Sequence, residues 1–145
     1  MRIRQVTVSN DTDWLKLRKE FWPSCPEEEH AHDGEDLVSN PRKAAFVLCN
    51  DEGEAAAFVE LALRKFVNGC STSPVAFVEG IFVAPQERRH GWARQLLLVA
   101  EDWARSKGCS ELASDVLLDN EVSHALHMGC GFEETERVVY FRKSV

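Results

Sequence analysis

Hydrophobic and polar positions predict four strands in the first 83 residues. Residues 2–8 (RIRQVTV) alternate with a period of two, which is typical of a half-buried strand. Residues 44–50 (AAFVLCN) and 55–66 (AAAFVELALRKF) flank a polar DEGE turn and should form an antiparallel hairpin. Residues 75–83 (VAFVEGIFV) are apolar enough for a central strand buried on both faces. Gly80, in the middle of that run, indicates a bulge or a close backbone approach.

Helical spacing appears first after residue 11. Asp11 can cap a helix that has Trp14, Leu17 and Phe21 on one face. The next segment contains two prolines and many acids, so we predict a loop there, followed by a short helix around Glu35–Val38.

The second half of the chain predicts alternating helices and strands. They are a helix over residues 93–108, a strand over 110–117, a short helix over 120–128 and a final strand over 132–143. Asn120 could cap the short helix. The order of elements predicts one domain over residues 1–145, of mixed α/β class with a central sheet flanked by helices. The helix at 93–108 should connect two parallel strands.

Composition and charge limit the classes of partner and the cellular location that we expect. The net charge of −7 argues against nucleic acid or an anionic membrane and favours a cationic partner. No apolar run approaches the ~20 residues of a membrane span, and the N-terminus lacks an apolar signal region, so we expect a cytoplasmic protein. Five widely spaced cysteines without a CxxC pair predict neither disulfides nor a zinc site.

Residues 88–94, RRHGWAR, place three arginines and a histidine around Gly91 at the start of a predicted helix. A helix N-terminus presents unpaired N–H groups and a positive dipole end, so a diphosphate is the expected ligand. Gly91 has no Cβ and can adopt positive φ close to that ligand. The nucleotide patterns GxGxxG and GxxxxGK[ST] are both absent. On these seven residues alone, a basic helix start with a turn glycine is an equal alternative.

Residues 88–93 also match R-x-x-G-x-A, and the segment resembles the coenzyme A pyrophosphate loop of the GNAT N-acetyltransferase superfamily. Longer blocks are similar to the aminoglycoside 6'-N-acetyltransferases within that superfamily. These blocks are EFWPSCP, HDGEDL, KFVNGCSTSPVAFVEGIFV, ELASD and GFEETERVVYFRK. The resemblance implies direct transfer of an acetyl group from acetyl-CoA to the 6'-amine of a polycationic drug in a ternary complex, with no metal. It further implies antibiotic resistance and a homodimer.

The resemblance also implies site residues. Acetyl-CoA would be held by Ile81, Phe82, Val83, Arg89, His90, Gly91, Trp92, Ala93, Arg94 and Asn120. The drug would be held by Trp22, Phe66, Glu79, Asp115 and Glu136, with Phe66 at a position where matching family members have a tyrosine hydroxyl. The catalytic positions would be Glu79, Val83 and Asp115. Glu79 would orient and deprotonate the amine, directly or through water, and a backbone N–H of the strand would stabilise the oxyanion, an effect of ~3 kcal/mol.

Alternatives remain at this point. The chain could acetylate another amine, such as a polyamine or a protein N-terminus, or be a non-catalytic module that binds coenzyme A and dimerises. Many superfamily members have a tyrosine acid four residues before the glycine of the GF pair, where this chain has His127. His127 could protonate the departing sulfur or only pack the short helix, and Tyr140, the only tyrosine, has no geometric reason to reach the site.

Overall fold

The computed structural model describes residues 1–145 and contains five strands and four α-helices. The strands are β1 (Arg2–Gln5), β2 (Lys43–Cys49), β3 (Ala55–Arg64), β4 (Val75–Val83) and β5 (Leu112–Ser114). The helices are α1 (Thr12–Phe21), α2 (Glu27–Ser39), α3 (Trp92–Ser106) and α4 (Glu121–Gly129), and a 3-10 turn, Pro85–Glu87, precedes α3.

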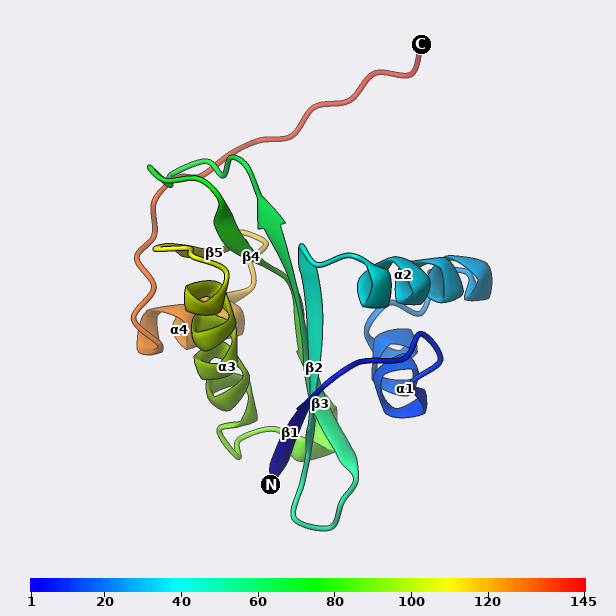
Figure 1. Ribbon diagram of the computed structural model, residues 1–145. Coiled ribbons are helices and arrows are strands. Elements are labelled where there is room, and N and C mark those ends of the chain that lie inside the picture. The colour runs from blue at the N-terminus through cyan, green and yellow to red at the C-terminus, as the bar shows by residue number, and fades with distance from the viewer.

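The strands form one sheet in the order β1-β2-β3-β4-β5. All neighbouring strands are antiparallel except β4 and β5, which are parallel and are connected through α3. Figure 1 shows α1 and α2 on one face of the sheet and α3 and α4 on the other. The predicted mixed sheet flanked by helices, the β2–β3 hairpin and the parallel pair across the long helix are therefore confirmed.

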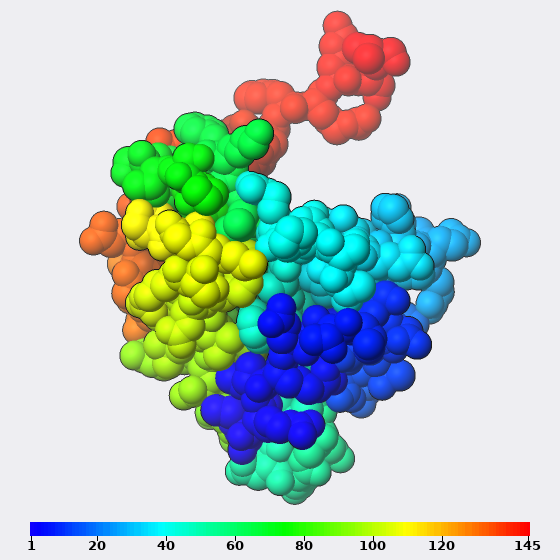
Figure 2. Space-filling model, in the orientation of Figure 1, coloured from blue at the N-terminus to red at the C-terminus, as the bar shows by residue number.

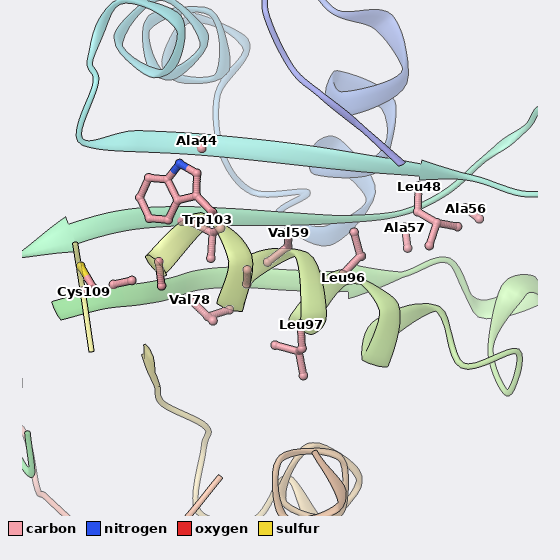
Figure 3. Packing of buried hydrophobic residues seen from close by; sticks show 14 residues of the cluster. Ala44, Leu48, Ala56, Ala57, Val59, Val78, Leu96, Leu97, Trp103 and Cys109 are labelled. Atoms are coloured by element: carbon pink, nitrogen blue, oxygen red, sulfur yellow. The ribbon is translucent and has the colours of Figure 1, made fainter. Parts of the chain in front are cut away.

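α3 fills the core on its side of the sheet. Its buried residues Leu96, Leu97 and Trp103 recur at helical spacing and pack against Val59 and Val78 of the central strands (Figure 3). Burial of each such side chain contributes about 1.5–3 kcal/mol. This packing fixes α3 against β3 and β4, and with it the position of the loop that precedes the helix.

α1 and α2 cover the opposite face. Asp11 caps α1 as predicted, because its carboxylate accepts a hydrogen bond from the Trp14 amide at 3.0 Å. α2 spans Glu27–Ser39 and is much longer than the predicted Glu35–Val38. The acids that suggested a loop, Glu27–Glu29, lie in its first turn, where the helix dipole favours negative charge.

The final strand predicted over residues 132–143 was wrong. Residues 131–145 form no helix or strand. The first of them still contact the body, through Phe132 and Thr135, and the last leave it as an extended tail (Figures 1 and 2). A strand needs a partner for its backbone groups, and the edge strand β5 offers only three residues. The apolar side chains of Val138–Phe141 are consequently between 47% and 92% exposed.

Two predicted strands are shorter than expected. β1 ends at Gln5 rather than at residue 8, since the chain turns away to reach the α1 cap, and β5 covers 112–114 rather than 110–117. No helix combines the length and the apolar composition that spanning a membrane requires.

Candidate active site

β4 contains a bulge at Glu79. Val78 pairs with Leu61 and Gly80 pairs with Glu60, so Glu79 is an extra residue with no partner on β3. A bulge bends a strand and re-aims a side chain, and Glu79 is the one exposed residue of β4. The bulge that Gly80 suggested is confirmed, and it turns a carboxylate outward from an otherwise buried strand.

β4 and β5 separate at this bulge. Their parallel pairing ends at Val78 and Ser114, whereas β3 remains paired with β4 as far as Val83. One edge of β4 from residue 79 to 83 therefore has no neighbouring strand. Because Val78 faces Ser114, Glu79 and Asp115 occupy the next position of each strand, where the two begin to diverge.

Side chains on both faces hold the free edge of β4 in place. The Phe82 ring lies 5.1 Å from the Phe21 ring and 6.2 Å from the Phe58 ring on the α1 side. Ile81 and Val83 pack on the other side, against the cluster beneath α3. The backbone of residues 81–83 is therefore rigidly supported while its edge is open.

The loop before α3 has the geometry of an anion site. Gly91 is the N-cap of α3 with φ 78°, in the left-handed region, and no protein atom lies within 4 Å of the place where a Cβ would stand. The backbone N–H groups of residues 89–94 donate to no other group of the protein. Arg89 also has a positive φ of 65°, a conformation that costs a non-glycine residue about 1–3 kcal/mol and is concentrated at functional sites. The sequence-based expectation for Gly91 is confirmed in its conformation.

Neighbouring side chains hold this loop. Glu87 accepts a hydrogen bond from Asn50 at 2.8 Å and one from the Trp92 indole at 3.4 Å. Arg94 donates to the Gly129 carbonyl at 3.0 Å and so ties the start of α3 to the end of α4. Six free amides, the dipole of a 15-residue helix and exposed arginines fit a pyrophosphate group without a metal.

Predicted acceptor residues fall into two groups. Trp22 lies against the bulge, because a Cβ on Gly80 would stand 2.7 Å from the Trp22 ring. Trp22 thus lies beside Gly80, while Glu79 and Asp115 follow the last pair of β4 and β5. Phe66 is 72% exposed just beyond the end of β3, and Glu136 lies in the tail.

The tail passes close to the segment that carries Phe66. Thr135 lies directly against Gly69, so Glu136 follows a residue that contacts the loop after β3. No interaction joins Glu136 to Glu79 or Asp115 in this chain.

Glu79 has a cationic partner that was not predicted. Arg64 donates to both carboxylate oxygens, at 3.1 and 2.9 Å, and its guanidinium stacks 3.6 Å from the centre of the Phe77 ring. This bidentate geometry fixes the carboxylate plane. The sequence alone does not show that Arg64 reaches Glu79, because this contact depends on the β3–β4 register and on the bulge within it.

A second unpredicted cluster lies behind Trp22. Arg18 is 3.2 Å from both carboxylate oxygens of Glu60, 2.8 Å from Asp33 and 2.7 Å from His30 Nδ1. A signal was present in the sequence, since Arg18 interrupts the apolar face of α1 and Glu60 interrupts the apolar run AAAFVELALR.

α4 holds the remaining candidates. The Asn120 side chain accepts from the Ser123 amide at 3.1 Å and caps α4, as predicted. His127 Nδ1 lies 2.7 Å from the Ser123 carbonyl and must donate to it, while Nε2 lies 2.8 Å from the Ser114 hydroxyl. Both ring nitrogens are engaged, and the ring packs 5.0 Å from Phe132. His127 therefore connects α4 to the end of β5. No group of His, Cys, Asp or Glu residues is arranged to hold a metal ion.

Comparison with known sequences and structures matches this arrangement to one family. Residues 12–132 match the Acetyltransferase (GNAT) family. The chain is 43% identical over 144 residues to an aminoglycoside N(6')-acetyltransferase type 1 of Salmonella enteritidis, covering 99% of both chains. It is 47% identical over 133 residues to the enzyme of the same name from Serratia marcescens, covering 91% of both.

Solved structures agree. The structure of AAC(6')-Iy with the bisubstrate analog CoA-S-monomethyl-acetylneamine superposes with a TM-score of 0.94 at 42% identity, covering 99% of this chain and 98% of that one. The aminoglycoside 6'-N-acetyltransferase AAC(6')-Ih from Acinetobacter baumannii gives a TM-score of 0.90 at 43% identity, covering 99% and 98%. A divergent β4–β5 pair, free amides at the start of α3 and similarity along the full chain lead to one conclusion: the protein belongs to the GNAT acetyltransferase family.

Proposed function

We propose that this protein is an acetyl-CoA-dependent aminoglycoside 6'-N-acetyltransferase. The observation that carries the proposal is the free edge of β4 beside six unpaired amides, in a chain similar over its full length to enzymes of that name. A bisubstrate analog that joins coenzyme A to an acetylated aminoglycoside is bound in the AAC(6')-Iy structure, which supports both substrate classes.

The donor side follows from the backbone. The amides of residues 89–94 would bind the pyrophosphate, with Gly91 allowing close approach. The free edge of Ile81, Phe82 and Val83 would pair with the pantetheine amides in the manner of an added strand, and a N–H of this edge would stabilise charge on the carbonyl oxygen. Asn120 would contribute a contact from the cap of α4.

The acceptor side combines acids with aromatic rings. Glu79 and Asp115 would attract a polycation at the strand divergence, and Trp22 would form the wall beside them. Phe66 and Glu136 would extend this surface towards the loop after β3. Glu79, already oriented by Arg64, would accept the proton that the amine loses, directly or through water.

The chemistry then needs no covalent enzyme intermediate. The amine nitrogen bonds to the thioester carbonyl carbon while the C–S bond breaks, the coenzyme A thiolate departs, and the amine proton passes to Glu79 or solvent. The product amide has lost the positive charge of the amine. Such a drug binds ribosomal RNA less well, so we expect the gene to confer aminoglycoside resistance. The proposal goes with a cytoplasmic location, where acetyl-CoA and ribosomes meet.

The direct test is release of free thiol from acetyl-CoA with kanamycin as acceptor and spermine as the comparison. Aminoglycoside turnover with a kcat/KM at least about 100-fold above that for spermine supports the assignment. Preference for spermine or an N-terminal peptide moves the protein to another amine, and cofactor binding without turnover of any acceptor makes it a binding module. Resistance is tested by comparing the minimal inhibitory concentration of kanamycin for bacteria with and without the expressed protein.

We further propose that the protein is a homodimer in which the tail is buried. Val139, Tyr140 and Phe141 are 77%, 82% and 92% exposed on a tail that leaves its own body, and a second copy would cover them. The double variant Val139→Asp, Phe141→Asp should be monomeric by light scattering after gel filtration. Val8→Asp, at another exposed apolar residue, should leave the assembly unchanged. A monomeric wild-type chain contradicts the proposal.

A further inference from the structure

A buried charge cluster joins α1, α2 and β3 next to the acceptor wall. At its centre is the guanidinium of Arg18, a residue whose side chain is only 9% exposed. Glu60 of β3 faces it with two oxygens at 3.2 Å, and on α2 Asp33 lies at 2.8 Å and His30 Nδ1 at 2.7 Å. Three separate elements therefore converge on one side chain.

The hydrogen-bond roles in this cluster are fixed by chemistry. A guanidinium only donates, so His30 Nδ1 accepts and its proton resides on Nε2. That Nε2 is buried and has no partner. Burial lowers the pKa of His30, and the neighbouring Arg18 lowers it further, so the ring stays neutral. The cationic charge of the cluster belongs to Arg18 alone.

The cluster also touches the residue that would bind the acceptor. The Arg18 guanidinium lies 4.8 Å from the centre of the Trp22 ring, within the range of a cation–π contact. The Cζ2 and Cη2 atoms of the indole lie against the Gly80 backbone at the bulge, and the ring centre is 4.6 Å from the Phe21 ring. Trp22 thus contacts both Arg18 and the strand segment that presents Glu79.

Stability alone does not explain these charges. Buried ion pairs are replaced by apolar side chains of similar volume with little loss of stability, or with a gain. Here they occupy an apolar face that already contains Trp14 and Leu17. What an apolar residue could not provide is a directional hold on the Trp22 ring.

Glu60 is the adjustable member of the cluster. Burial raises its pKa to about 7, although the Arg18 guanidinium opposes the shift, and the negative charges of Asp33 and Glu79 raise it further. The groups that face it are Arg18 from α1, Asp33 and the neutral His30 from α2, and Glu79 from β4. When Glu60 is ionised, Arg18 forms ion pairs with Glu60 of β3 and with Asp33 of α2. When Glu60 is protonated, only the ion pair with Asp33 remains.

We propose that Arg18 and Glu60 are positioning residues for acceptor binding, which fix the Trp22 indole over the β4 bulge and hold it most firmly when Glu60 is ionised. The proposal rests on the proposed function, because it takes Trp22 as the wall of the acceptor site. Neither residue touches the donor loop, so acetyl-CoA binding is independent of the pair.

The test separates positioning from folding with a matched control. Arg18→Gln removes the charge beside Trp22, and Arg4→Gln removes a similar charge that pairs with Asp11 and Asp13 at the other end of α1. With kanamycin, Arg18→Gln should raise the acceptor KM at least about 10-fold, with the acetyl-CoA KM within about twofold. Arg4→Gln should change neither KM by more than about twofold, even where thermal unfolding shows equal destabilisation.

A second variant tests whether the ionisation of Glu60 affects acceptor binding. Glu60→Gln imitates the protonated carboxyl, so its acceptor KM divided by that of the wild type should be near one at pH 6 and about threefold or more at pH 8. This ratio cancels the titration of the drug itself. It also decides the matter if Arg18→Gln does not fold.

The outcomes are distinct. A ratio that is constant with pH, or equal acceptor KM values for folded Arg18→Gln and Arg4→Gln, overturns the positioning role while the wild type still turns over kanamycin. Absence of kanamycin turnover in the wild type instead refutes the proposed function, and the proposal falls with it.

Discussion

The variant Gly91→Val tests the anion site most directly. Gly91 has φ 78°, and no protein atom lies within 4 Å of a Cβ built there, so the valine side chain meets no clash inside the chain. Its effect on folding is the backbone strain alone, about 1–3 kcal/mol. That same side chain extends into open space beside the loop whose free amides, those of residues 89–94, would bind the pyrophosphate. A hydrogen bond to a charged group contributes about 1.5–3 kcal/mol. If the valine side chain prevents two of the amides from bonding to pyrophosphate, acetyl-CoA affinity falls roughly 100-fold or more.

Gly108 provides the matched control. It has φ 76°, is equally free of neighbouring atoms, and lies after the opposite end of α3, about 25 Å away along the helix. Gly108→Val should therefore have a similar loss of thermal stability and an unchanged Kd for acetyl-CoA by calorimetry. Equal Kd values for the two folded variants would refute the reasoning, because strain without loss of affinity means that the amides do not bind the cofactor.

Three further predictions address other residues. His127→Phe should lower kcat less than about fivefold, since both ring nitrogens are already engaged with Ser123 and Ser114; a fall near 100-fold would identify a general acid instead. Glu60 has a pKa raised from 4.5 to about 7, so the folded chain keeps a proton that the unfolded chain loses. Stability should decrease by up to about 3 kcal/mol as pH rises through that interval, and urea unfolding at pH 5 and pH 8 should show this slope for the wild type and not for Glu60→Gln. Asp115→Asn should raise KM for kanamycin more than for acetyl-CoA, and added salt should weaken kanamycin binding in the wild type; a salt-independent affinity contradicts this.

Local signals predicted the parts of the site that depend on one segment. The helical spacing of α3 and the glycine at its start place the free amides without knowledge of any other element. Gly80 in an apolar run was enough to indicate the bulge, because a strand buried on both faces has little other use for glycine.

The features that the sequence did not predict depend on contacts between distant segments, or on whether a strand finds another strand to pair with. The acids of α2 looked like a solvated loop, although three of them stabilise the first turn of a helix that His30 and Leu37 anchor in the core. The tail has the composition of a strand, but it pairs with no strand of its own chain, and the neighbouring edge strand β5 offers only three residues. Arg18 and Glu60 each break an apolar pattern, and only the packing of α1 on β3 shows that they do so together.

The bulge in β4 makes Glu79 dispensable to the architecture. On either side of it, Val78 and Gly80 already pair with adjacent residues of β3. A chain lacking residue 79 could close a regular ladder with β3 without shifting a single pair. It would lose the outward carboxylate with its Arg64 pair, and the bulge at which β4 and β5 separate. Single-residue deletions elsewhere in a central strand reverse every later side chain between core and solvent. At this one position the deletion should instead yield a well-paired sheet that lacks the carboxylate we propose as the proton acceptor, so that folding and catalysis can be separated by removing a residue rather than by replacing one.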